Sequence, residues 1–260
     1  MKLIVACGQF APAGGAIARN TDVMRSLAAR AARAGASVVV LPELCLCGYP
    51  SPADARARAV AVDGPEIDAV RAFARELKVA VAFGFAEAAH SGVLHNSMAF
   101  VDAAGLVSSV YRKVHLWISE KAWAEPGDSF RTFDAGGQRA GMWICYDTRF
   151  PEAARSLARD RATLALVGSA WFGPAQEWEL AIRARALDNG IFVAGASVLG
   201  SFGPERFFGE SLIVDPHGTV LARARRGRQG IITAAVDAAA VDAFRTRLPL
   251  LSDLRPESYA

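Results

Sequence analysis

The segment AGMWICYDTRFPE, Ala140–Glu152, decides how the rest of the chain is interpreted. An apolar run ends at Cys145, a polar turn follows, and Pro151-Glu152 opens a stretch with helical spacing. A strand, a sharp turn and a helix in this order place the side chain at the turn where a substrate can reach it. A thiol there acts as a nucleophile when a base removes its proton and a cation stabilises the oxyanion that forms. The segment therefore predicts a cysteine-dependent enzyme with a base and a cation near Cys145.

Two other strand-like runs also end in charged residues. The run VVVLPE ends in the carboxylate of Glu43, and the run VSSVYRK ends in the ammonium group of Lys113. Reactive groups collect at the carboxyl ends of strands in open α/β sheets, so we expect Glu43, Lys113 and Cys145 to lie together. Taken singly, each charge is better explained as an ordinary residue at the boundary of a buried strand.

The set of three motifs resembles the carbon–nitrogen hydrolase, or nitrilase, superfamily. The motifs are LPEL at 41–44, YRKVHL at 111–116 and CYDxRFPE at 145–152, and the resemblance runs from Ile4 to the Arg255-Pro256-Glu257 tail. The resemblance implies a four-layer α-β-β-α sandwich. It also implies that Glu43 is the general base, that Lys113 stabilises the oxyanion and that Cys145 is the nucleophile.

Two further groups are candidates for the same site. Glu120, seven residues after Lys113, resembles the second catalytic glutamate that related amidases keep in this loop, where it would orient Lys113 and the substrate amide. Glu125 competes for this role, but its position before Pro126-Gly127 suggests a turn. The backbone N–H of Tyr146, one residue beyond the nucleophile, is the candidate second oxyanion donor.

Aromatic residues on or near the expected catalytic loops are candidates for the walls of a substrate pocket. They can equally belong to the core or to a subunit interface. The candidates for substrate binding are Tyr49, Trp117, Trp171 and Phe172. We expect Asp147 and Arg149 to fix the turn that follows Cys145, and we interpret His115 as structural.

The pattern along the chain predicts one domain over residues 1–260, with 246–260 an extended tail. Strands and helices alternate early and strands pair later, which indicates a mixed sheet or two sheets between helical layers. We expect helices at 20–34, 64–78, 176–189 and 236–244, the first with its N-cap at Asn20-Thr21-Asp22. We expect strands at 3–10, 37–41, 79–86, 95–101, 106–112, 162–167, 191–198, 207–214, 219–224 and 230–236, besides the one that ends at Cys145.

Composition limits the function classes. The chain has 260 residues, 52% of them hydrophobic, with 29 basic and 26 acidic residues and a net charge of +3. This near balance predicts neither nucleic acid nor membrane partners, and we interpret Arg223–Arg228 as a solvated hairpin loop. Four cysteines do not make a disulfide framework, and Cys45-x-Cys47 lacks a second ligand pair, so we expect no metal and no cofactor. We see no signal peptide and no run of roughly 20 apolar residues, which favours the cytoplasm.

The predicted reaction is hydrolysis of a non-peptide C–N bond in a small amide, either a carboxylic amide or an ω-amide. Cys145 would form a thioester, and ammonia and a carboxylic acid would be released. True nitrilases tend to carry Cys-Trp-Glu at the nucleophile and a C-terminal extension, whereas this short chain has Cys-Tyr-Asp. Two alternatives to amide hydrolysis remain open: hydrolysis of N-carbamoyl amines or amino acids, and hydrolysis of small nitriles. A non-catalytic binding subunit would be expected to lack one of Glu43, Lys113 and Cys145.

The family resemblance also predicts assembly. Its members pack protomers helix layer to helix layer, so we expect a homodimer or a larger even homo-oligomer. The apolar segment 248–256 is expected at a subunit interface or across its own sheet, because apolar side chains are costly to leave in water.

Overall fold

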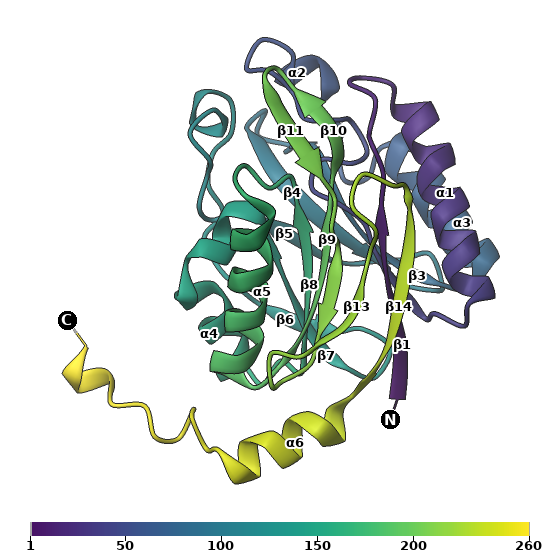
Figure 1. The fold of residues 1–260 in the computed structure, drawn as a ribbon. Helices are drawn as coiled ribbons and strands as arrows, with labels where there is room; N and C mark the ends of the chain where they lie inside the picture. The colour runs from purple at the N-terminus through teal and green to yellow at the C-terminus, as the bar shows by residue number, and fades with distance from the viewer. Residues whose placement is uncertain (1, 260) are drawn as a thin grey trace.

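The computed structural model of the chain describes residues 2–259, in which two six-stranded sheets lie face to face between outer layers of helices (Figure 1). The first sheet has the strand order β14-β1-β2-β3-β4-β5, and the second has the order β13-β12-β9-β8-β7-β6. The central strands β1, β2 and β3 are parallel, as are β7, β8 and β9, and the strands at the margins are antiparallel. The expected four-layer α-β-β-α sandwich is therefore confirmed.

The strand bounds are as follows. The first sheet contains β1 (Lys2–Gln9), β2 (Val38–Val40), β3 (Ala80–Ala88), β4 (Leu94–Val101), β5 (Val107–Arg112) and β14 (Gly230–Asp237). The second sheet contains β6 (Thr132–Asp134), β7 (Arg139–Ile144), β8 (Leu164–Ser169), β9 (Phe192–Ser197), β12 (Leu212–Val214) and β13 (Val220–Arg223). A separate hairpin consists of β10 (Leu199–Phe202) and β11 (Glu205–Phe208).

Helices cover the outer face of each sheet. The first sheet is covered by α1 (Ile17–Arg33) and α3 (Pro65–Leu77), and the second by α4 (Pro151–Arg159) and α5 (Ala175–Asn189) (Figure 1). The remaining helical elements are α2 (Ala55–Arg58), α6 (Ala238–Arg247) and the 3-10 turns η1 (Glu120–Ala122), η2 (Cys145–Arg149) and η3 (Pro256–Ser258). Among residues 2–259, no helix is both long enough and apolar enough to span a membrane.

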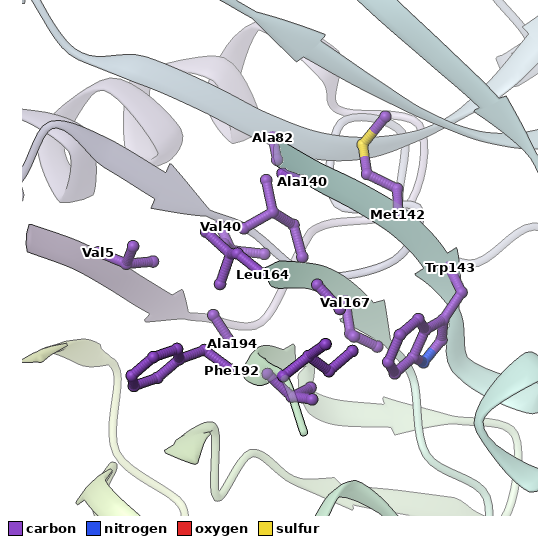
Figure 2. Close-up of a cluster of buried hydrophobic side chains, with 14 of the residues drawn as sticks. Val5, Val40, Ala82, Ala140, Met142, Trp143, Leu164, Val167, Phe192 and Ala194 are labelled. Carbon is purple, nitrogen blue, oxygen red and sulfur yellow. The ribbon is translucent and has the colours of Figure 1, made fainter. Parts of the chain in front are cut away.

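The largest hydrophobic core fills the space between the two sheets and continues through the second sheet to the helices α4 and α5. Figure 2 shows Val5, Val40 and Ala82 of the first sheet together with Leu164 and Ala194 of the second. The side chains of β2 are buried on both faces, because the sheet lies between the inner core and the helices α1 and α3. This double burial explains why the strand is a continuous apolar run.

Three expectations for individual elements are wrong. Helix α1 begins at Ile17, so Asn20 lies inside the helix and is not its N-cap. The buried Asn20 side chain accepts a hydrogen bond from Ala13 N and donates to Ala13 O and Leu46 O. The strand expected at 207–214 is broken between β11 and β12, where Gly209 and Glu210 take left-handed conformations with φ of 72° and 57°. The segment after Arg223 is solvent-exposed as expected but is no hairpin, because β13 pairs with β12 and β14 pairs with β1 in the other sheet.

The segment after α6 lies along the outside of the molecule and ends away from the sheets (Figure 1). Leu251 is partly buried against the largest hydrophobic cluster, whereas Leu248, Leu250 and Tyr259 are exposed.

Candidate active site

Glu43 enters the space between the sheets because two glycines leave room for its backbone. A Cβ atom at Gly84 of β3 would lie 2.4 Å from Leu44 N, and one at Gly168 of β8 would lie 2.9 Å from Glu43 N. Only a residue without a side chain allows backbones to approach this closely. Leu44, with φ of 50°, completes the turn. The buried Glu43 carboxylate is thereby placed beyond the end of β2.

Cys145 occupies the sharp turn between β7 and α4. Its φ of 43° is uncommon for a residue with a side chain and costs on the order of 1–3 kcal/mol, which surrounding contacts must offset. The buried Asp147 carboxylate supplies such contacts. It accepts hydrogen bonds from Ile144 N at 3.0 Å, from Tyr111 Oη at 2.6 Å and from His115 N at 2.9 Å. The expected role of Asp147 in fixing this turn is confirmed.

Lys113 lies between two buried carboxylates. Its Nζ donates to Glu43 Oε1 at 2.7 Å and to Glu120 Oε1 at 2.9 Å, and all three side chains are fully buried. Backbone groups help to fix Lys113 and Glu120 in place: Lys113 N donates to Asn96 O of β4, and Trp117 N donates to Glu120 Oε2. The structure thus places Glu120 of η1, rather than Glu125, against Lys113.

Ala170, just beyond the end of β8, connects the carboxylate to the thiol. Its N–H donates to Glu43 Oε2 at 2.7 Å, and its carbonyl oxygen accepts from Cys145 Sγ at 3.4 Å. One residue therefore sets the positions of both groups. Glu43, Lys113 and Cys145, which are far apart in the sequence, are brought to one place by the ends of β2, β5 and β7.

The electrostatics of the cluster favour a base that is active near neutral pH. Burial raises the pKa of Glu43 to about 7, against the lowering effect of the Lys113 charge. Burial would also raise the pKa of Glu120, but the charge and hydrogen bonds of Lys113 prevail and lower it. Burial alone would lower the pKa of Lys113, yet the two carboxylates raise it well above its ordinary value. Lys113 thus stays charged and pairs with an ionised Glu120, while Glu43 can exchange a proton.

The thiol itself is held in its protonated form. Burial, and then the negative charge of Glu43, raise the pKa of Cys145. A thiolate forms here only when another group takes the proton, and Glu43 is the carboxylate that shares Ala170 with the sulfur.

Asn96 is a part of the site that sequence reasoning missed. Its Nδ2 donates to Glu43 Oε1 and to Glu120 Oε1, both at 2.8 Å, so one amide holds both carboxylates. Its Oδ1 is buried and has no hydrogen-bond partner among the described residues. A signal was present in the sequence, because His95-Asn96-Ser97 interrupts an otherwise apolar strand and each buried polar group there needs a partner.

Replacing Asn96 with alanine should lower kcat about 10- to 100-fold and the free energy of unfolding by about 1–3 kcal/mol, since each carboxylate loses a buried donor. Steady-state kinetics and urea unfolding would measure the two effects. The matched control is Ser97→Ala, because Ser97 donates instead to Glu87 Oε2. The control should change stability and leave kcat within about twofold. Equal kcat values for the two variants would contradict the role of Asn96.

Three of the four candidate pocket aromatics meet in one cluster over the site. Phe172 stacks on Trp117 with ring centroids 5.4 Å apart and meets Tyr49 edge-on at 5.5 Å. The Tyr49 hydroxyl donates to Glu120 Oε1 at 2.9 Å. Trp171 lies apart from them: it packs on Trp178 in the core, with the Arg149 guanidinium over its ring. Arg149 also pairs with Glu177 at 2.5 Å, which ties the turn after Cys145 to α5.

Among residues 2–259, no group of three or more His, Cys, Asp and Glu side chains is arranged to hold a metal ion. The four cysteines are free and buried.

Comparisons with known proteins agree with this arrangement. The family model described as carbon-nitrogen hydrolase matches residues 4–246. A 2-oxoglutaramate amidase of Bacillus subtilis is 30% identical over 100% of each chain, and the human omega-amidase NIT2 is 32% identical over 88% of this chain and 87% of its own.

Solved structures of an amidase from Nesterenkonia sp. are similar over nearly the whole length. One has 28% identity, covers 98% of this chain and 94% of its own, and superposes with a TM-score of 0.87. In a mutant of that amidase, with the same TM-score, the active-site cysteine carries the acetamide moiety of fluoroacetamide. The sandwich, the buried cluster and the match across residues 4–246 together show that this chain belongs to the carbon–nitrogen hydrolase family.

Proposed function

We propose that this enzyme hydrolyses small amides through a thioester on Cys145. The observation that carries the proposal is the position of Lys113, whose Nζ contacts Glu43 and Glu120 in a fully buried cluster beside the thiol. The amidases among its relatives support amide substrates.

In the first half of the reaction, Glu43 accepts the Cys145 proton as the sulfur attacks the amide carbon. The C–S bond forms, the carbonyl π electrons move to oxygen, and Lys113 with the Tyr146 N–H stabilises the oxyanion. Glu43 then gives its proton to the departing nitrogen, the C–N bond breaks, and ammonia leaves a thioester behind. Glu120 keeps Lys113 in place and charged throughout.

In the second half, Glu43 takes a proton from water, and the resulting hydroxide attacks the thioester carbon. The C–S bond breaks, the carboxylic acid is released, and the sulfur regains its proton from Glu43. Each residue returns to its starting state, so the cycle consumes one amide and one water.

Ammonia release over a panel of amides, N-carbamoyl compounds and nitriles tests the proposal. We expect the highest kcat/KM for an amide. Hydrolysis of nitriles alone, with no amide turned over, would overturn it.

The pH dependence of kcat/KM should show an acid limb with an apparent pKa near 7. Glu43 must be ionised to accept the thiol proton, and burial raises its pKa to about 7, so activity falls about tenfold per pH unit well below that value. Initial rates between pH 5 and 9 at low substrate concentration would define the limb. A limb near pH 4.5, the ordinary value for a glutamate, would contradict the assignment of the base.

We further propose that the enzyme is a homodimer or larger even homo-oligomer assembled through α5. Leu180 and Leu187 on its outer face are 70% and 46% exposed, which is costly for an unpaired helix face. Sedimentation should therefore give an even multiple of the 27.5 kDa chain mass. Leu180→Arg should lower this mass. The control Leu106→Arg, at another exposed leucine in the β4–β5 turn, should leave it unchanged.

We also propose that the enzyme is located in the cytoplasm. The four cysteines are free, and free thiols persist where the surroundings are reducing.

A further inference from the structure

A cavity of about 270 Å³ lies beside the aromatic cluster. It is at the end of the molecule where α2 and the β10–β11 hairpin lie (Figure 1). Three chain segments form its wall: the loop after β1, the segment from Tyr49 to Arg58, and the hairpin with the residues before it. The wall is mostly apolar, with side chains of Ala11, Val198, Leu199, Phe202 and Phe207. A cavity of this size is just below the range for drug-sized ligands and suits a short chain.

Tyr49 joins this cavity to the candidate active site. Its ring lines the cavity and packs against Phe202, while its hydroxyl donates to Glu120 Oε1. Ala170, which contacts both Glu43 and Cys145, packs in one cluster with Val198 and Phe207 of the cavity wall. A substituent on the acyl side of a bound amide therefore has an apolar space one side chain away from the catalytic carboxylates.

The charge of the cavity wall selects among acyl groups. Arg58 is the cation in the wall, but its Nη2 is bound to Asp54 Oδ2 at 2.7 Å and its Nη1 donates to Tyr49 O. Arg149, on the other side of the cluster, is likewise paired with Glu177. A substrate carboxylate in the cavity would lose its water and face an Arg58 whose charge Asp54 already balances, so its own charge would go uncompensated. A neutral acyl chain has no charge to desolvate when it enters the cavity, and it buries its apolar surface there.

Resting on the amidase function proposed above, we infer that this cavity binds the acyl chain of uncharged amides. We also infer that Asp54 is a specificity-determining residue that keeps Arg58 from recognising the carboxylate of ω-amides. The substrate class is thus short- to medium-chain aliphatic or arylalkyl carboxamides.

The test compares acetamide, butyramide, hexanamide and the monoamide of glutaric acid, whose chain is close to that of hexanamide in length. The value of kcat/KM should rise about tenfold or more from acetamide to hexanamide, and the glutaric monoamide should lie at least about 100-fold below hexanamide. A glutaric monoamide preferred over hexanamide would overturn the inference.

Two variants examine the wall directly. Ala11→Phe fills the cavity from its exposed edge and should lower kcat/KM about tenfold more for hexanamide than for acetamide. Ala103→Phe, the same change in an exposed turn between β4 and β5, serves as the control. Asp54→Ala releases Arg58 and should raise kcat/KM for the glutaric monoamide about tenfold. A purely structural role for Asp54 predicts loss rather than gain.

The outcomes separate this inference from the proposed function. Suppose acetamide is hydrolysed, but kcat/KM does not rise from acetamide to hexanamide and Asp54→Ala does not raise kcat/KM for the glutaric monoamide. This outcome would overturn the cavity assignment and leave the amidase function standing. No hydrolysis of any amide would overturn both.

Discussion

Replacing Cys145 with alanine should lower kcat for amide hydrolysis by at least about 10⁴-fold, because Cys145 is the thiol that shares Ala170 with the base Glu43 and forms the thioester. The fold should persist: the change removes one sulfur atom from a turn that Asp147 holds through Ile144 N, Tyr111 and His115. Ammonia release and thermal unfolding would measure the two quantities. Mass spectrometry of the native enzyme after iodoacetamide treatment should find one label, on Cys145.

The matched control is Cys47→Ala, which removes a buried thiol from a neighbouring loop. Cys47 Sγ donates to Leu44 O and is not bonded to Glu43 or Lys113 among the described residues, so we expect a small loss of stability and kcat within a few-fold of the native value. Activity that survives in Cys145→Ala, or labelling spread evenly over the four cysteines, would overturn the mechanism.

Replacing Lys113 with methionine should lower kcat about 10²- to 10³-fold and the free energy of unfolding by about 3–5 kcal/mol. The variant loses the cation that stabilises the oxyanion and leaves Glu43 and Glu120 facing each other in a water-poor space. Without the positive charge the pKa of Glu43 should rise above 7, so the acid limb of kcat/KM should move to higher pH. Urea unfolding and pH-dependent kinetics would measure these changes.

A second substitution separates the two effects of Lys113→Met. In Lys113→Met/Glu120→Gln, one of the two uncompensated carboxylates is removed, so part of the lost stability should return while kcat stays low. Lys121→Met serves as the control, because Lys121 is exposed on η1 next to Glu120. Equal effects of Lys113→Met and Lys121→Met would show that Lys113 has no special role.

The central part of this site was predictable from the sequence because its side chains stand at strand ends. Glu43 and Cys145 follow apolar runs, and Lys113 follows the strand-like run VSSVYR. Strand patterns of this kind are among the strongest local signals. The place of Glu120 came from the resemblance to related amidases rather than from local pattern. Asn96 was missed because it lies inside a strand, where polar residues are ordinarily attributed to a solvated face, yet here both faces are buried.

Other features depend on tertiary partners that no local pattern contains. The run 207–214 begins and ends with apolar residues, but the left-handed conformations of Gly209 and Glu210 separate β11 from β12. The loop after Arg223 has the composition of a hairpin turn, but pairing with β1 takes β14 into the other sheet. Gly84 and Gly168 read as ordinary strand residues until the Glu43 backbone is seen against them.

The pairing of β14 with β1 also constrains how the protein is made. Every residue of β1 from Lys2 to Gln9 is matched with one from Asp237 back to Gly230, so β1 has no partner on this side until β14 has been synthesised. Until then the first sheet keeps an unpaired apolar margin, of the kind that other chains can add to. We therefore expect that synthesis halted before Gly230 leaves nascent chains that depend on chaperones, whatever the length of helix and sheet already formed.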